Sequence, residues 1–233
     1  MTLVALAMIL TGMMALVGGA SYLLPWVWRQ FRMRKVRREI IGKRLLVLTY
    51  DDGPSGGVTP QLLDLLRDRK ANATFFMLGQ NAGQHPAIVD RAVREGHDVG
   101  CHSDRHLHAW KTLPWTAVGD IRAGYEQLSR WISPNAMFRA PYGKLTLPTY
   151  LELMRRGATV WWWTVDSGDT YETLPATAEI INRVREQGGG IVLMHDLDRS
   201  PQRTDFVLEL TAGLLDAAKR ENFSVVPLRE VCR

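Results

Sequence analysis

Two adjacent aspartates, Asp51 and Asp52, stand at the end of a hydrophobic run. The apolar residues 45–48 precede the pair and Gly53 follows it, so the two aspartates lie where a buried strand is expected to end. Neighbouring side chains of a strand point to opposite faces and cannot share one environment. Either one aspartate only forms the turn, or the two carboxylates have different tasks at one site.

Two histidines are the second group with metal-binding chemistry. His102 and His106 are four residues apart, which lets both rings reach one ion from a helical turn or a tight loop. Together with one carboxylate of the Asp51–Asp52 pair they form a set of two histidines and one acid. Such a set suits catalytic zinc, although the same ligands also hold non-haem iron. The other carboxylate then remains free to act as a base.

The order of the predicted elements explains how these residues meet. Strands and helices alternate along the chain, which indicates a parallel α/β sheet, either doubly wound or closed into a barrel. Seven strands are expected, at residues 45–50, 73–78, 97–100, 137–139, 158–163, 190–194 and 224–227. Among the intervening helices, one is expected to begin after Thr59 as its N-cap.

Ionisable residues follow five of the predicted strands. In parallel α/β folds, ligand sites lie beyond the carboxyl ends of the strands, so these residues are expected at one rim. They are Asp51 and Asp52, His102 and His106, Arg139, Asp166 and Asp169, and His195 and Asp196. Each of them alone is compatible with a turn or a cap, but five such strand ends together indicate a catalytic centre.

Five motifs identify the family that this chain resembles. TYDDGP, HSDRH, RAPYG, DSGD and LMH occur in this order and resemble the motifs of the polysaccharide deacetylase family, the NodB-homology or carbohydrate esterase family 4 domain. The resemblance covers about residues 44–233 and implies an α/β fold of the distorted (β/α)7-type barrel kind. It also implies a hydrolase that uses a divalent metal, most commonly Zn²⁺ with Co²⁺ as an alternative, to remove N-acyl groups from amino sugars.

The resemblance also assigns roles to individual residues. It implies that Asp51 is the catalytic base, tethered by Arg139, and that His195 is the general acid, oriented by Asp166. The implied metal ligands are Asp52, His102 and His106. The backbone N–H of Tyr142 is expected to hold the oxyanion, and Leu193 to line the acyl pocket.

One position departs from the family pattern. Thr170 stands where the family commonly has a tryptophan that helps to wall the acyl pocket. Acetyl is still the expected acyl group, with formyl or a bulkier group as the alternatives. Trp163 is the side chain expected to compensate. The alternative interpretation of Trp163 and its two tryptophan neighbours is that they are core residues.

The amino-terminal part of the chain predicts a membrane segment. No charged residue lies between Leu3 and Trp28, and about 20 apolar residues suffice to cross a bilayer, so residues 1–28 are expected to form one transmembrane helix. Residues 29–44 hold eight Lys or Arg against one Glu and are expected to be a basic linker that contacts membrane lipids. Because positive flanks stay in the cytoplasm, the catalytic domain, residues 45–233, is expected on that side, with the extracellular face as the alternative.

Three functions are compatible with these features. The first is deacylation of an N-acylated amino sugar in lipid-linked form at the membrane. The second is the same reaction outside the cell on peptidoglycan or another polysaccharide, and the third is non-catalytic sugar binding on the same fold. Nucleic acid is excluded as a partner, because the excess positive charge lies in residues 29–44 and not in the domain.

A short aromatic loop at residues 108–115 has two interpretations. The sequence HAWKTLPW is expected to place Trp110, Leu113 and Trp115 against the helix that follows. The alternative is that the loop dips into a membrane.

Overall fold

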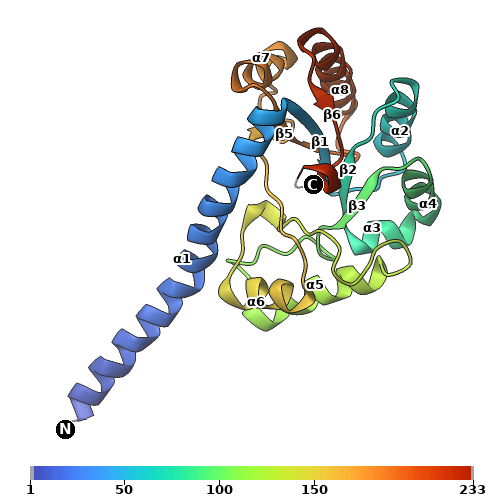
Figure 1. Ribbon diagram of the computed structural model, residues 1–233. Helices are drawn as coiled ribbons and strands as arrows, with labels where there is room; N and C mark the ends of the chain where they lie inside the picture. Colours follow the sequence, from blue (N-terminus) through green and yellow to red (C-terminus); the bar gives the residue numbers. More distant parts are fainter. Residues whose placement is uncertain (1–2, 232–233) are drawn as a thin grey trace.

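A long amino-terminal helix precedes the α/β domain. The computed structural model describes residues 3–231, without the side chains of residues 3–11 and 13–17. The first helix, α1 (Leu3–Lys43), runs along the domain, and its amino-terminal part extends beyond it (Figure 1). In the described part of the chain, no helix is sufficiently long and apolar to cross a bilayer. The predicted membrane segment lies largely outside the residues whose side chains are described.

The core of the domain is a parallel sheet centred on β1 (Leu45–Asp51), which is buried along its whole length. The strand order is β3-β2-β1-β5-β4, and a sixth strand, β6, pairs with the first residues of β1. The other bounds are β2 (Thr74–Met77), β3 (Asp98–Cys101), β4 (Val165–Asp166), β5 (Gly190–His195) and β6 (Ser224–Val225). Continuous apolar runs such as residues 45–48 and 191–194 are typical of strands covered on both faces.

Two of the seven predicted strands are reduced to single bridges. Phe138 pairs with Cys101 on one side and with Val160 on the other, and these bridges continue the sheet beyond β3. The segment at residues 137–139 cannot extend, because Pro141 has no N–H to donate and begins a 3₁₀ turn. The chain after Val160 pairs regularly again only at β4. The barrel is therefore distorted, with six strands among the described residues.

A ring of helices surrounds the sheet, as Figure 1 shows. Their bounds are α2 (Val58–Asp68), α3 (Gly79–Gln84), α4 (Pro86–Arg94), α5 (Pro114–Gln127), α6 (Leu147–Arg156), α7 (Thr177–Gln187) and α8 (Pro201–Glu221). The sequence did not indicate α3, and the prediction that Thr59 caps α2 is wrong. Gly57 is the N-cap, and the Thr59 hydroxyl instead donates to the buried Asp196 carboxylate at 2.8 Å.

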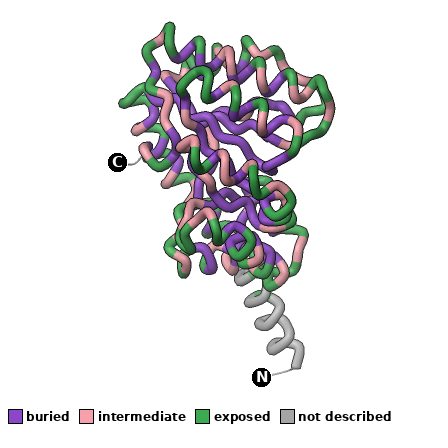
Figure 2. The backbone as a smooth tube through the Cα atoms, turned by 90° about the vertical axis from the view of Figure 1, so that its right-hand side faces the viewer, coloured by how far each residue is buried: buried purple, intermediate pink, exposed green. Residues whose placement is uncertain are grey.

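The basic segment is not a separate linker, because it forms the second part of α1 and packs on the barrel. Met33, Val36 and Ile40 are buried in the main hydrophobic cluster at the spacing of one helical face. Closer to the amino terminus, the Trp28 ring contacts the Trp162 ring at a centroid distance of 5.4 Å. Figure 2 shows the buried strands enclosed between helices that expose their outer faces. Arg34, Lys35, Arg37 and Arg38 are exposed on the outer side of this helix, whereas Arg29 and Arg32 pack over tryptophan rings of the domain.

The aromatic loop does not dock the following helix as expected. Leu113 is 57% exposed and Trp115 is 70% exposed, although both lie at the start of α5. Trp110 donates its indole N–H to the Leu145 carbonyl at 2.8 Å, which fixes the loop to the neighbouring segment instead. The loop therefore presents apolar side chains to solvent.

Candidate active site

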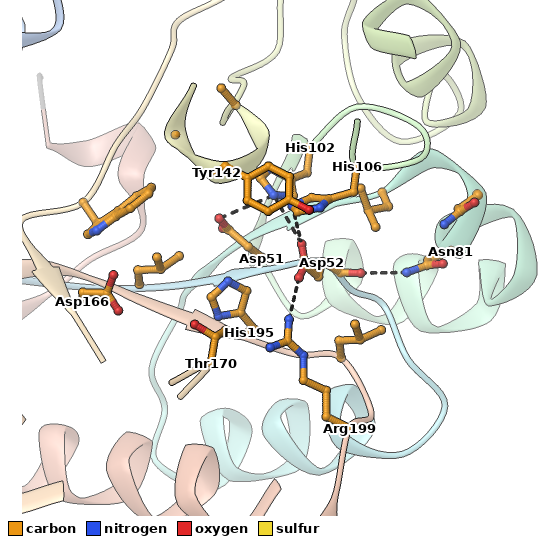
Figure 3. A pocket seen from close by; sticks show the side chains of 17 residues that line it. Asp51, Asp52, Asn81, His102, His106, Tyr142, Asp166, Thr170, His195 and Arg199 are labelled. Carbon is orange, nitrogen blue, oxygen red and sulfur yellow. Dashed lines mark hydrogen bonds and ion pairs between the residues drawn. The ribbon is translucent and has the colours of Figure 1, made fainter. Parts of the chain in front are cut away.

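A turn at the end of β1 brings both aspartates into one cavity. Asp51 is the last residue of the strand, and Asp52 adopts a left-handed conformation with φ of 72°. Aspartate is one of the few side chains that tolerate this conformation. Both carboxylates therefore line the same cavity of about 640 Å³, instead of pointing to opposite faces (Figure 3).

Asp51 is paired with a buried arginine. The Arg139 guanidinium has no solvent exposure, and its Nη1 donates to Asp51 Oδ1 and to Thr49 Oγ1, both at 2.8 Å. The guanidinium also lies over the Phe76 ring, 4.2 Å from its centroid. The sheet thus places a permanent cation against Asp51, which is the contact that the family resemblance implied for Arg139.

Asp52, His102 and His106 form a cluster suited to a metal ion. Their ligand atoms lie within 4.8 Å of one another, and Asp52 Oδ1 is 3.4 Å from His102 Nε2 and 3.2 Å from His106 Nε2. Asp52 Oδ1 is buried and has no hydrogen-bond partner in the described part of the chain. The Arg139 carbonyl accepts from His102 Nδ1 at 2.8 Å, which directs the Nε2 atom toward Asp52. Two histidines and one carboxylate, whose Oδ1 is unpartnered, fit a divalent metal such as zinc.

The charges of the cluster also favour a cation. Burial alone raises the pKa of Asp52, but its close contact with His102 and the charges of the neighbouring imidazoles outweigh burial and hold this pKa well below the usual range. Burial lowers the pKa of His106 to about 4, so its ring is neutral at pH 7. For His102, burial lowers the pKa, yet the charges of Asp51 and Asp52 outweigh burial and raise it. The negative potential that raises the pKa of His102 also attracts a metal ion.

His195 is oriented by Asp169, and the expectation that Asp166 does this is wrong. His195 Nδ1 lies 2.9 Å from Asp169 Oδ1, and the His195 backbone N–H donates to Asp169 Oδ2 at 2.7 Å. Asp166 instead accepts the Gly168 N–H at 2.9 Å within its own turn. Because Gly168 is left-handed, with φ of 71°, the chain reverses after β4 and returns Asp169 to the end of β5.

The pairing with Asp169 changes the proton affinity of His195. Burial alone lowers the pKa of this imidazole, but the hydrogen bond to Asp169 and the charges of the nearby carboxylates outweigh burial and raise it to about 9. His195 is therefore protonated at neutral pH in the absence of metal. In Figure 3 it lies on the opposite side of the two aspartates from His102 and His106.

The remaining predicted residues lie in the wall of the cavity. Leu193, Trp163 and Thr170 all line it, so the threonine that replaces the common tryptophan does face the site. Tyr142 is also in the wall, with a left-handed φ of 57°, and its ring lies 4.6 Å from the rings of His106 and His108.

Sequence reasoning missed two contacts of the aspartate pair. Arg199 Nη2 donates to Asp52 Oδ2 at 3.1 Å, and no motif marks this arginine. Asp196 follows His195 directly and is fully buried, where it accepts from the Gly53 N–H at 3.1 Å. Burial raises the pKa of Asp196 to about 7. A Cβ atom at Gly53 would collide with this carboxylate, so Asp196 holds the turn after Asp52 in place.

Comparison with known proteins agrees with this geometry. The family model for polysaccharide deacetylase matches residues 39–161, which is more than half of the chain. The chain belongs to the polysaccharide deacetylase family. It is therefore a carbohydrate N-deacetylase, a hydrolase of amide bonds in a metal-dependent family, and the resemblance seen in its five motifs is confirmed.

Two curated relatives cover most of this deacetylase. A peptidoglycan-N-acetylglucosamine deacetylase of Bacillus cereus is 32% identical over 195 residues, which are 82% of this chain and 89% of the relative. A chitooligosaccharide deacetylase of Bradyrhizobium sp. is 29% identical over 214 residues, 86% of this chain and 96% of the relative.

Solved structures share the fold. The family 4 carbohydrate esterase from Streptomyces lividans, in complex with acetate, has a TM-score of 0.67 and 30% identity, covering 77% of this chain and 90% of its own. The chitin deacetylase from Colletotrichum lindemuthianum has a TM-score of 0.70 and 30% identity, covering 81% and 87%. The α/β fold with its parallel sheet is thus shared with structures of carbohydrate esterase family 4.

Proposed function

We propose that this deacetylase removes the N-acetyl group from amino sugars of a polysaccharide, with peptidoglycan as the first candidate. The observation that carries the proposal is the pair of oppositely charged contacts on the two sides of the cavity, Asp51 with Arg139 and His195 with Asp169. One pair supplies a carboxylate base and the other a protonated acid, as hydrolysis of an amide requires. Curated relatives named for peptidoglycan and chitooligosaccharide substrates support the substrate class.

The metal ligands in this proposal are Asp52, His102 and His106, with Zn²⁺ as the first candidate ion. When bound, the ion supplies Lewis acidity toward the amide carbonyl and lowers the pKa of water. Arg199 contacts the second oxygen of Asp52, so it orients this carboxylate from outside the ligand set.

The protein groups divide the proton transfers between them. Asp51 takes a proton from the attacking water, whose oxygen bonds to the carbonyl carbon of the amide. The Tyr142 backbone N–H donates to the oxygen that becomes negatively charged. As the C–N bond breaks, His195 gives its proton to the departing nitrogen, and acetate and a free amine result. Asp169 supports this step because it keeps His195 protonated.

The size of the acyl group depends on three side chains. Leu193 and Trp163 line the cavity and are proposed to contact the acetyl methyl group. Thr170 leaves more room than the tryptophan common at this position, so acyl groups larger than acetyl are the natural second substrates. Thr170→Trp is expected to narrow the acyl range to acetyl, and a comparison of acetyl, propionyl and butyryl glucosamine oligomers measures this directly.

A lipid-linked amino sugar is the second candidate substrate. In support of it, residues of α1 between Tyr22 and Arg29 lie beside Gly143, a residue that also lines the cavity. For this second candidate we propose that residues 1–28 attach the protein to the membrane as a single-pass protein, with the domain on the cytoplasmic side because residues 29–44 are basic. Peptidoglycan, the first candidate, instead requires the domain outside the cell. A reporter fused to the carboxyl terminus would place the domain on one side of the membrane.

The test uses three substrates and two variants of the metal-loaded full chain. Peptidoglycan, a soluble N-acetylglucosamine oligomer and a polyprenyl-phosphate N-acetylamino sugar are incubated with the protein, and free amine is measured. Asp51→Asn should abolish release, whereas Asp216→Asn, the same change on the exposed side of α8, should not. Release from the lipid-linked substrate alone would replace the first candidate by the second. Metal binding without amine release from any substrate would contradict the proposed reaction.

A further inference from the structure

We propose that a surface beside the active site binds an anionic lipid bilayer. The surface, called the aromatic face below, is formed by α1 and by the loop that precedes α5. Its members are large apolar side chains between 41% and 70% exposed, namely Tyr22, Leu23, Trp26, Trp110, Leu113 and Trp115. Exposed apolar side chains scattered singly are normal on soluble proteins, but a contiguous group indicates an interaction surface.

One contact joins the two parts of the aromatic face, and a second fixes the loop to the domain. The Tyr22 ring of α1 meets the Trp110 ring edge-on, with centroids 5.4 Å apart. Trp110 is also held by its indole hydrogen bond to the Leu145 carbonyl. The helix and the loop therefore present their apolar side chains from one fixed surface, and the proposal does not depend on movement of either.

Positively charged side chains flank the aromatic face. Lys144 lies over the Trp110 ring, 4.4 Å from its centroid, and Arg29 lies over the Trp162 ring at 5.5 Å. Lys111 follows Trp110 directly and is exposed. No Asp or Glu occurs in residues 18–38 or in residues 105–119. Tryptophan and tyrosine prefer the interface between lipid and water, and lysine and arginine are attracted to anionic headgroups. This combination of aromatic and positively charged side chains makes an anionic bilayer the expected partner of the aromatic face.

The aromatic face lies at the end of the barrel where the cavity opens. His108 is in the same loop, and its ring lies 4.6 Å from the ring of Tyr142, which lines the cavity. Helix α1 passes from this end, where Tyr22 lies near Lys144, to the opposite end, where Ile40 packs beside Leu45 at the start of β1. A bilayer at the aromatic face would therefore lie next to the mouth of the cavity. The inference rests on this placement and not on the proposed reaction.

Two labelled variants of the full chain test the proposal. Leu113→Cys and Met154→Cys are each made with Cys232→Ser and labelled with an environment-sensitive fluorophore, since Cys101 is buried. Met154 is a matched control, because it is also 57% exposed but lies on the last turns of α6, away from the aromatic face. Emission is recorded with vesicles of phosphatidylglycerol and with vesicles of phosphatidylcholine.

The proposal predicts a blue shift at position 113 with phosphatidylglycerol vesicles and a smaller shift with phosphatidylcholine. The label at position 154 should not respond, and adding Lys111→Glu should reduce the response at position 113. An absent shift at position 113, or equal shifts at both positions, would overturn the proposal. A shift at position 113 caused by a soluble N-acetylglucosamine oligomer without vesicles would make the surface a sugar subsite instead. A shift that grows with protein concentration alone would make it a contact between two copies.

Discussion

Replacement of Asp169 by asparagine tests which of two carboxylates near the end of β4, Asp166 or Asp169, orients His195. Asp169 is 2.9 Å from His195 Nδ1, and the pKa of His195 is raised to about 9 from an ordinary value near 6.5. This difference of roughly 2.5 pH units corresponds to about 3 kcal/mol of preference for the protonated imidazole. Asp169→Asn is expected to lower this pKa well below 9, because only the charges of Asp51 and Asp52 then remain to oppose burial.

The loss of charge has two measurable effects. In the metal-free protein, imidazole NMR signals of His195 should titrate near pH 9 in the wild type and at clearly lower pH in Asp169→Asn. In the metal-loaded enzyme, the alkaline limb of the kcat profile should move to lower pH, because the neutral imidazole has no proton for the departing amine.

The free energy of unfolding should also depend on the Asp169–His195 pair. The folded protein holds the proton of His195 more tightly than the unfolded chain does, so the contribution of the pair is fully present below pH 6.5 and is lost as the pH rises through about 9. In the metal-free protein, the difference in free energy of unfolding between wild type and Asp169→Asn should therefore shrink across this range.

Asp166→Asn is the matched control for this experiment. Asp166 lies three residues earlier, and among the described residues its carboxylate accepts a hydrogen bond from the Gly168 N–H and none from His195. The control variant should leave the titration of His195 unchanged. If Asp166→Asn lowers the pKa of His195 and Asp169→Asn does not, the assignment of the orienting carboxylate is refuted.

Three further predictions concern the metal, the core and acid stability. Zn²⁺ at a hundred times its Kd should stabilise the folded protein by about 2.7 kcal/mol, which raises the Tm. Asp52→Ala should abolish this rise in Tm, and an equal rise in the variant would place the metal elsewhere. Arg139→Met leaves the Asp51 carboxylate buried without its cation and should lower the free energy of unfolding in urea by about 3–5 kcal/mol. Arg130→Met, at the exposed Arg130–Asp90 pair, should change it little, and equal losses in the two variants would contradict this prediction. Burial lowers the pKa of His97 to about 4, so about 3 kcal/mol of stability present at pH 7 should be lost as the pH falls from 6.5 to 4. His97→Gln should reduce the dependence of the free energy of unfolding on pH between 6.5 and 4. An unchanged pH dependence in this variant would show that other groups cause the loss of stability.

Most of the site could be predicted because the ends of the strands can be located in the sequence. The residues that follow β1, β3 and β5 must meet at one end of a parallel sheet, so Asp52, His102 and His106 could be grouped from their positions alone. Asp166 and Asp169 could not be told apart in this way, because both stand in the segment DSGD. The choice depends on the left-handed Gly168 turn, which reverses the chain between them.

The contacts that sequence could not indicate depend on tertiary structure. Arg199 reaches Asp52 from a loop after β5 that has no periodic pattern. Phe138 and Val160 form only isolated bridges, and the segment of Phe138 is ended by the turn that begins at Pro141. In α1, the apolar face of Met33, Val36 and Ile40 is hidden among basic residues, so charge alone suggested a linker where the structure has a packed helix.

The placement of two carboxylates side by side is explained by the different cations around them. Asp51 keeps the extended conformation of β1 and meets the fully buried Arg139, which cannot lose its charge. Asp52 leaves the strand in a left-handed turn and meets the imidazoles of His102 and His106, which can bind a metal ion when their Nε2 atoms carry no proton. A single residue of separation is thus sufficient, because the backbone turn between them assigns one carboxylate to a fixed cation and the other to an exchangeable one. This division suits a base and a metal ligand that must act on the same water molecule.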